Sequence, residues 1–193
     1  MMKKQIKIFI HALSPYKGII YFLVMLFFSH CLWKWVVDAD FHGQDIAIFG
    51  KDFTPQFYSL SQKTATWVYD FMKLFPKTDH LRINDTFIMF LGGDMILNII
   101  WGCTGVKQFF SFFMVMVFYL GPWKKKLWYI PLSLAILWIY NIIRIAAIIF
   151  LTENNRDRFE FLHDGLFRWI FYGIIFLLWV YWEEVIRIRH KKA

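Results

Sequence analysis

Hydrophobic residues in this chain are concentrated in long runs separated by polar segments. Each run approaches the ~20 residues that an α-helix needs to cross a hydrocarbon core of ~30 Å. The runs cover residues 18–37, 106–122, 127–151 and 165–182. The pattern predicts a mostly α fold, a polytopic membrane helical bundle with about four transmembrane helices, in a single integral membrane domain over residues 1–193.

Residues 38–105, between the first two runs, are more polar and predict an extracytoplasmic segment. Within it, residues 57–75 place apolar side chains at near-helical spacing with polar residues between them. This spacing indicates an amphipathic helix. Two interpretations fit it equally well: the helix rests on the outer leaflet, or it packs on a β-hairpin that we expect from residues 86–101.

The stretch 86–101, "TFIMFLGGDMILNIIW", is apolar enough to be a fifth span. However, Gly92-Gly93 divides it into two strand-length runs, and Asp94 follows directly. Two glycines between short apolar runs are typical of a β-hairpin. We therefore expect a hairpin at the membrane surface rather than a further helix.

The composition agrees with a membrane protein. Hydrophobic residues make up 59% of the 193 positions, well above the roughly 45–50% of soluble domains. The net charge of +8 comes from basic residues dispersed around the apolar runs, with no basic helix face. We therefore expect the lipid bilayer as a partner and no nucleic acid.

The distribution of charge predicts the orientation in the membrane. Residues 1–17, 123–126 and 185–193 together carry eleven Lys and Arg. Residues 38–105 and 152–164 carry seven, together with twelve of the fourteen acidic residues. Because cytoplasmic connections are enriched in Lys and Arg, both termini are expected in the cytoplasm and the two acidic segments outside.

Arg144 is the most unusual residue of the apolar runs. It lies seven residues before Leu151, about 10 Å below the outer end of its helix at ~1.5 Å per residue. A charge at such depth costs on the order of 2.5–3.5 kcal/mol on insertion scales, so it usually marks a functional site. The alternative is a structural hydrogen-bond hub with Asn141, three residues earlier on the same face.

Cys103 precedes the second apolar run. A helix start and a nearby cation such as Lys107, four residues on, both favour a thiolate, and Gly102 and Gly105 leave room for a substrate backbone. The alternatives are a packed small side chain or a disulfide with Cys31. Cys31 lies about six residues below the outer end of its helix, which makes the disulfide a poor match.

His163 lies two residues before the fourth apolar run, and in isolation it would be an ordinary surface histidine. The predicted topology nevertheless gathers Cys103, Arg144 and His163 at the outer side of one bundle. The remaining histidines show no ligand spacing, and two cysteines are too few for a multi-cysteine metal site. We therefore expect neither a metal nor another cofactor.

Such a trio suits acyl transfer. A thiolate attacks a peptide carbonyl to give a thioester, a histidine serves as acid and then base, and a guanidinium stabilises the oxyanion. Two other interpretations stay open. In the first, the chain is a non-catalytic membrane assembly or scaffold protein. In the second, it is a purely hydrolytic protease of the same build.

The motifs "CTG" at 103–105 and "NIIR" at 141–144, followed by His163, resemble the exosortase/archaeosortase family of membrane cysteine transpeptidases. The resemblance covers roughly residues 83–182. It implies that Cys103 is the nucleophile, Arg144 the oxyanion or thiolate stabiliser and His163 the acid–base, with Asn141 and Lys107 in support.

The resemblance also implies a substrate and a location. The substrate would be a secreted protein whose C-terminal sorting tail consists of a short motif, a transmembrane helix and a basic cluster. The tail would be removed at the outer face of a bacterial or archaeal cell membrane, and the new C-terminus passed to an envelope acceptor.

Overall fold

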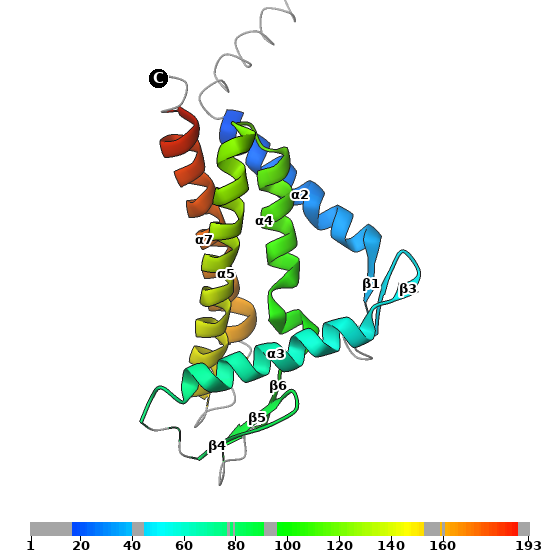
Figure 1. The fold of residues 1–193 in the computed structure, drawn as a ribbon, viewed down its shortest axis with the longest axis vertical. Coiled ribbons are helices and arrows are strands. Elements are labelled where there is room, and N and C mark those ends of the chain that lie inside the picture. The colour runs from blue at the N-terminus through cyan, green and yellow to red at the C-terminus, as the bar shows by residue number, and fades with distance from the viewer. Residues whose placement is uncertain are drawn as a thin grey trace, which may run out of the picture.

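The structure is a computed structural model that describes residues 17–39, 45–76, 78, 80–90, 96–152, 159 and 161–188. Its bundle consists of α2 (Lys17–Val36), α4 (Val106–Phe118), α5 (Trp123–Thr152) and a last helix, which runs through η3 (Phe161–Leu166), α7 (Phe167–Tyr181) and η4 (Trp182–Ile188). These helices stand side by side (Figure 1).

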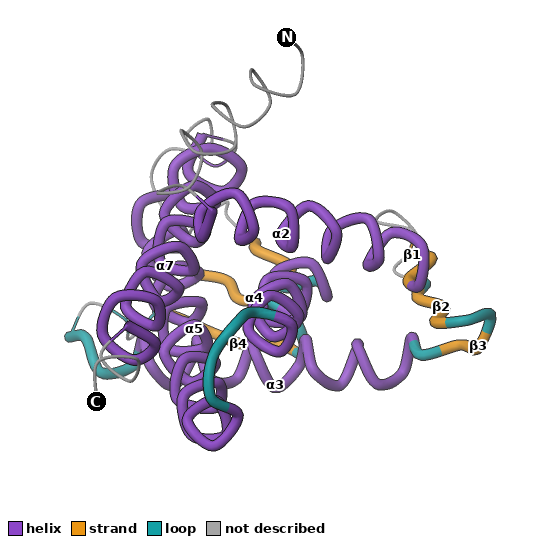
Figure 2. The backbone as a smooth tube through the Cα atoms, turned by 90° about the horizontal axis from the view of Figure 1, so that it is seen from above, coloured by secondary structure: helices purple, strands orange, loops and turns teal. Residues whose placement is uncertain are grey.

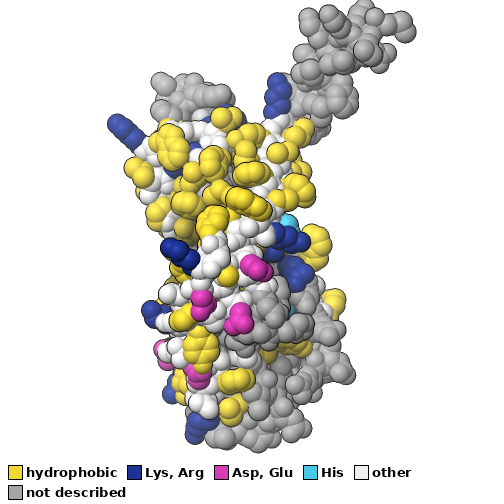
Figure 3. Space-filling view, turned by 90° about the vertical axis from the view of Figure 1, so that its right-hand side faces the viewer, with side chains coloured by type: hydrophobic (Ala, Val, Ile, Leu, Met, Phe, Trp, Pro, Cys, Tyr) yellow, Lys and Arg dark blue, Asp and Glu magenta, His cyan; other side chains and the backbone are white. Residues whose placement is uncertain are grey.

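Three helices within the described residues are long and apolar enough to cross a membrane: Lys17–Val36, Trp123–Thr152 and Phe161–Arg187. The fold class is therefore confirmed as a mostly α membrane bundle. In the space-filling view, hydrophobic side chains form a broad band over the upper half, and acidic side chains lie below it (Figure 3).

The second predicted span is a shorter helix than its apolar run. Helix α4 has 13 residues, or ~20 Å, against ~45 Å for the 30 residues of α5. It ends where Tyr119 turns extended, just before Gly121 and Pro122. The buried ammonium of Lys126 donates to the carbonyls of Val117 (3.0 Å) and Tyr119, and so satisfies two of the carbonyls at this helix end.

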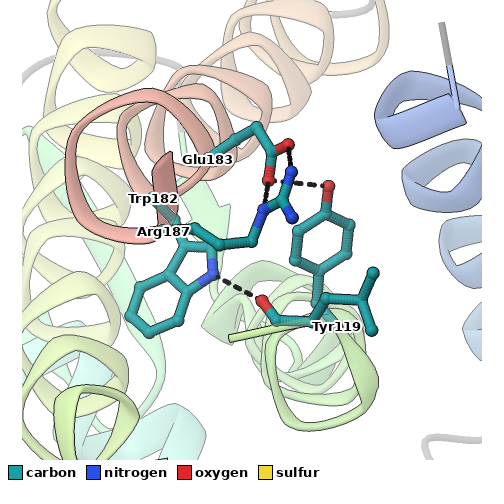
Figure 4. Close-up of polar contacts among 5 residues, drawn as sticks. Tyr119, Trp182, Glu183 and Arg187 are labelled. Atoms are coloured by element: carbon teal, nitrogen blue, oxygen red, sulfur yellow. Dashed lines mark hydrogen bonds and ion pairs between the residues drawn. The ribbon is translucent and has the colours of Figure 1, made fainter. Parts of the chain in front are cut away.

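The α4–α5 turn is fixed to the last helix at the same end of the bundle (Figure 4). The indole N–H of Trp182 donates to the carbonyl of Leu120 at 3.1 Å. The Tyr119 hydroxyl donates to Glu183 at 3.0 Å, and Glu183 also pairs with Arg187. This network closes the end of the bundle at which the basic turn 123–126 lies.

The bundle core is largely aromatic. Phe22 of α2 stacks on Trp179 of α7 with ring centroids 4.7 Å apart, and Phe171 is fully buried beside α4 and α5. The complete set of buried residues in this core is Phe22, Phe112, Val115, Met116, Tyr119, Tyr129, Ile130, Leu137, Phe171, Ile175, Trp179, Trp182 and Ile186.

Helix α3 (Thr54–Met72) lies across the opposite end of the bundle, below the start of α4 (Figures 1 and 2). Its buried face, which includes Ala65, Val68 and Met72, packs against Ile142 and Ile145 of α5 and against a small sheet. An amphipathic helix is therefore present in the predicted region. Of the two interpretations of its apolar face, packing against the protein is the one that the structure shows.

The predicted hairpin is confirmed. Strands β5 (Phe87–Phe90) and β6 (Ile96–Asn98) pair antiparallel with Ile88 opposite Leu97. Gly92-Gly93 and Asp94 lie outside the described residues. A third strand, β4 (Leu81–Asn84), joins β5 through a tight turn in which Asp85 has a φ of 58°. The sequence did not predict β4.

A second small sheet follows α2 and was also not predicted. It consists of β1 (Val37–Ala39), β2 (Ile46–Ile48) and β3 (Lys51–Asp52), paired antiparallel in that order. Strands of two or three residues are too short to show the period-two alternation by which strands are recognised. Both sheets lie at the end of the bundle away from the α4–α5 turn (Figure 1).

Candidate active site

Cys103 is held in a tight turn ahead of α4. The turn is the 3₁₀ helix η2 (Trp101–Thr104), in which the Cys103 amide donates to the Ile100 carbonyl at 2.9 Å. Gly105 follows with a φ of 78°, a left-handed conformation that favours glycine. A Cβ there would lie 3.0 Å from the Phe109 ring and 3.3 Å from the Asn141 side chain. The local fold thus depends on Gly105.

Helix α5 supplies two polar side chains from one face, three residues apart. Asn141 and Arg144 are 1% and 5% exposed. The Asn141 amide donates to the carbonyl of Cys103 at 2.9 Å, and the Arg144 guanidinium donates to the carbonyl of His163 at 3.2 Å. One helix therefore holds the backbone of both the cysteine turn and the histidine turn.

His163 lies in η3, a π-helical turn that begins the last helix. Its ring stacks on Phe159 with an interplanar angle of 12° and centroids 5.2 Å apart. Its Nε2 lies 4.0 Å from the Sγ of Cys103. The two groups can therefore exchange a proton after a small approach.

The thiol, the guanidinium and the imidazole line one cavity of about 440 Å³. Lys107, the predicted supporting cation, lines it as well. Asn141, the other supporting residue, lies behind the cysteine turn and holds it through the hydrogen bond to Cys103. The structure thus brings all five predicted residues together.

Four further polar residues line the cavity and were not selected from the sequence: His30, Gln108, Arg168 and Tyr172. They come from α2, α4 and α7. A polar residue within an apolar run is a signal for such a role, and His30, Gln108 and Arg168 carry it. Whether these residues share a cavity depends on how each helix is rotated about its axis. The sequence does not show this rotation when a helix is apolar on almost every side.

The cavity has a positive lining. Lys107, Arg144 and Arg168 contribute cationic side chains, and none of its described lining residues is a carboxylate. Such a surface favours negative charge, whether on a thiolate, an oxyanion or an anionic group of a ligand. In the space-filling view, basic and histidine side chains gather just below the hydrophobic band at one edge (Figure 3).

Both cysteines belong to the described residues, and no disulfide joins them. Cys31 is exposed on α2, whereas Cys103 is half-buried. The disulfide alternative is therefore not what the structure shows, and Cys103 remains as a thiol beside His163.

The protein is therefore a helical membrane protein whose bundle places a cysteine–histidine pair next to a buried arginine. Residues 19–181 match the family described as transmembrane exosortase, and the chain belongs to that family. The match also covers α2, α3 and both sheets, which is more of the chain than the motifs alone suggested. Exosortases are membrane transpeptidases involved in protein sorting. No curated protein and no solved structure matches the chain.

Proposed function

We propose that this protein is a membrane-embedded cysteine transpeptidase that removes the C-terminal sorting tail of secreted proteins and transfers the new C-terminus to an envelope acceptor. The observation that carries the proposal is the 4.0 Å separation of Cys103 Sγ and His163 Nε2 in a cavity that Arg144 also lines. These are the groups that acyl transfer through a thioester requires.

In the first half of the reaction, His163 accepts the thiol proton and the Cys103 sulfur attacks the scissile carbonyl carbon. A C–S bond forms, and the tetrahedral intermediate collapses as the C–N bond breaks. His163 gives its proton to the departing amine nitrogen, and the tail leaves with a new N-terminus. The 4.0 Å distance suits a resting state, because catalytic hydrogen bonds often tighten only when substrate binds.

In the second half, an acceptor amine loses a proton to His163 and attacks the thioester carbonyl. The C–S bond breaks, the acceptor is joined to the new C-terminus, and the thiol is regenerated. Water in place of the amine gives simple hydrolysis by the same residues. The mass of the mature C-terminus distinguishes the two, since hydrolysis leaves a free carboxylate and transfer adds the mass of the acceptor.

Arg144 has two roles in this scheme. Its hydrogen bond to the His163 carbonyl holds the histidine turn against α5. Its positive charge at the cavity wall stabilises the thiolate and the oxyanion of the tetrahedral intermediate, where surroundings of low dielectric strengthen the interaction.

Asn141 and Lys107 support the nucleophile in different ways. Asn141 fixes the cysteine turn through its bond to the Cys103 carbonyl. Lys107 adds positive charge to the lining of the same cavity, on the first turn of α4. Both roles follow from position rather than from direct participation in bond making.

We place the site on the outer side of a bacterial or archaeal cell membrane, with both termini in the cytoplasm. Support comes from the basic α4–α5 turn, which lies at the opposite end of the bundle from α3 and the sheets (Figure 1). The terminal residues 1–16 and 189–193, which carry much of the charge bias, lie outside the described residues.

The test is processing of a tailed reporter. The chain is co-expressed with secreted reporter proteins that end in a transmembrane helix and a basic cluster, with tails taken from secreted proteins of the same genome. The wild-type chain should shorten one or more reporters, and the Cys103→Ala variant should leave them full length at equal membrane abundance. Normal processing by Cys103→Ala would refute a cysteine nucleophile and leave a non-catalytic or different role.

A further inference from the structure

Helices α2 and α7 meet at one end of the bundle and separate toward the other. Near the closed end, the Phe22 ring of α2 lies 5.8 Å from Phe176 and 4.7 Å from Trp179 of α7. From there α2 runs away from α5 and α7 (Figures 1 and 2). It stays in contact with α4, since Trp33 and Phe110 have ring centroids 5.3 Å apart. The axes of α2 and α7 thus diverge as a wedge beside α4, and the catalytic cavity lies in this wedge, because residues of all three helices line it.

One stripe of side chains on each helix shares its face with residues that line the catalytic cavity. On α2 it consists of Leu23, Phe27 and His30, which lie on one face because their spacing is four and three residues. Leu23 and Phe27 are 53% and 70% exposed. On α7 the stripe consists of Arg168, Tyr172 and Phe176, each four residues apart.

Both stripes lead into the catalytic cavity. His30, Arg168 and Tyr172 line the cavity, whereas Leu23, Phe27 and Phe176 lie closer to the closed end. The walls therefore change from apolar to polar and cationic at the depth of Cys103. The wedge therefore suits a bound chain that is apolar toward the closed end and polar at the cavity.

We propose that the α2–α7 wedge binds the transmembrane helix of the tailed substrate, which enters from the bilayer and presents its polar cleavage segment to Cys103. This assignment rests on the proposed function and specifies how the substrate reaches the site. A substrate that changes from polar chain to apolar helix at its cleavage point matches the change in the wedge walls. Because the wedge is continuous with the cavity, the scissile bond can reach Cys103 while the substrate helix stays in the bilayer.

Phe27 and Phe28 provide a matched pair for the test. Both are exposed phenylalanines of α2, at 70% and 52%, but they point about 100° apart around the helix axis. Only Phe27 belongs to the stripe that ends at His30. A change at either position perturbs the membrane-exposed surface to a similar degree, and only a change at Phe27 alters the wedge.

The experiment uses the full chain and the tailed reporter that the wild-type chain shortens. A photoreactive phenylalanine derivative replaces Phe27 or Phe28 in the Cys103→Ala background, which retains the uncut reporter. Irradiation should crosslink the reporter helix several-fold more from position 27 than from position 28. In the active chain, Phe27→Glu should slow processing several-fold relative to Phe28→Glu at equal membrane abundance.

Two failures are distinguishable. Equal or stronger crosslinking from position 28, while the wild-type chain still shortens the reporter, would overturn the wedge assignment and leave the proposed function intact. A wild-type chain that shortens none of the reporters would overturn the proposed function and the wedge assignment with it.

Discussion

The imidazole of His163 lies 4.0 Å from the thiol of Cys103, although 60 residues separate them in the chain. Neither residue belongs to α5, yet α5 sets their relationship. Asn141 holds the carbonyl of Cys103, and Arg144, one turn further along, holds the carbonyl of His163. The reactive side chains are thus placed through their own backbones, by two donors on one rigid helix.

Replacing Arg144 by lysine should abolish most activity although the charge is kept. An ammonium is a point charge without the planar set of donors that a guanidinium offers. It cannot both bond the His163 carbonyl and present charge to the cavity in the same geometry. We expect processing of the tailed reporter to fall by roughly 10²–10³-fold, as on loss of an oxyanion donor.

The matched control for Arg144→Lys is Lys107→Arg, which also keeps the charge but alters a residue placed only as a supporting cation. It should retain substantial processing. Near-normal rates for Arg144→Lys at equal membrane abundance would mean that the guanidinium geometry is unimportant.

Asn141→Ala should release the cysteine turn. The variant loses the hydrogen bond to the Cys103 carbonyl, and such a bond contributes about 1 kcal/mol net. We expect processing to slow by about fivefold, since every 1.4 kcal/mol corresponds to a factor of ten. Alkylation of Cys103 by iodoacetamide, measured in a Cys31→Ala background, should change rate as well. Ile143→Ala, on the exposed face of α5, should change neither quantity.

Gly105→Ala should damage the site, whereas Gly173→Ala should not. An alanine at position 105 would have to adopt a left-handed backbone conformation, which costs about 1–2 kcal/mol. Its Cβ would also press on Phe109 and Asn141. A Cβ at Gly173 meets nothing within 4 Å. Thermal unfolding in detergent should therefore show a lowered midpoint for Gly105→Ala alone. Equal midpoints and equal Cys103 alkylation rates would show that the turn tolerates a side chain.

The attachment of the sheet to α3 should weaken in acid. Hydrogen bonds from Tyr58 and then Gln62 hold the pKa of Asp85 below its usual range. Because the pKa of Asp85 is lowered in the folded state, its ionised carboxylate stabilises that state at neutral pH. This stabilisation is lost as the pH falls through the lowered pKa. Hydrogen exchange of the β4 and β5 amides, corrected for the intrinsic pH dependence, should rise in acid.

Asp85→Asn should remove this acid dependence, because the amide does not titrate. Asp70→Asn, at an exposed position of helix α3, should preserve the acid dependence. Identical acid profiles for the wild-type chain and Asp85→Asn would show that Asp85 does not link the β4–β5 turn to α3.

The bundle and the hairpin could be predicted because their signals are local. A long apolar run indicates a spanning helix, and Gly92-Gly93 between two short apolar runs indicates a hairpin. The length of α4 was less accessible, since Tyr119 and Leu120 continue the apolar run beyond the last helical residue, Phe118. Just beyond the end of the helix, Gly121 packs against the Trp182 ring, a contact between residues about 60 positions apart.

The site was predictable in part for the same reason. A buried arginine is conspicuous in an apolar run, and the cysteine turn carries two glycines. His30 is a polar residue within an apolar run, but only the rotations of α2 and α7 show that it and Tyr172 line the cavity. Those rotations are set by interhelical packing such as the Phe22–Trp179 stack, which leaves no periodic trace in helices that are apolar on almost every side.

The most direct test of the account is to identify the covalent intermediate. The chain and a full-length tailed reporter of the kind that it shortens are mixed in the absence of an acceptor amine, quenched in acid, digested and analysed by mass spectrometry. We predict that the Cys103 peptide carries the new C-terminus of the reporter through a bond that hydroxylamine cleaves, and that Cys103→Ala yields no such adduct. Cleavage that proceeds with the adduct on another residue, or with a bond that resists hydroxylamine, would contradict the account.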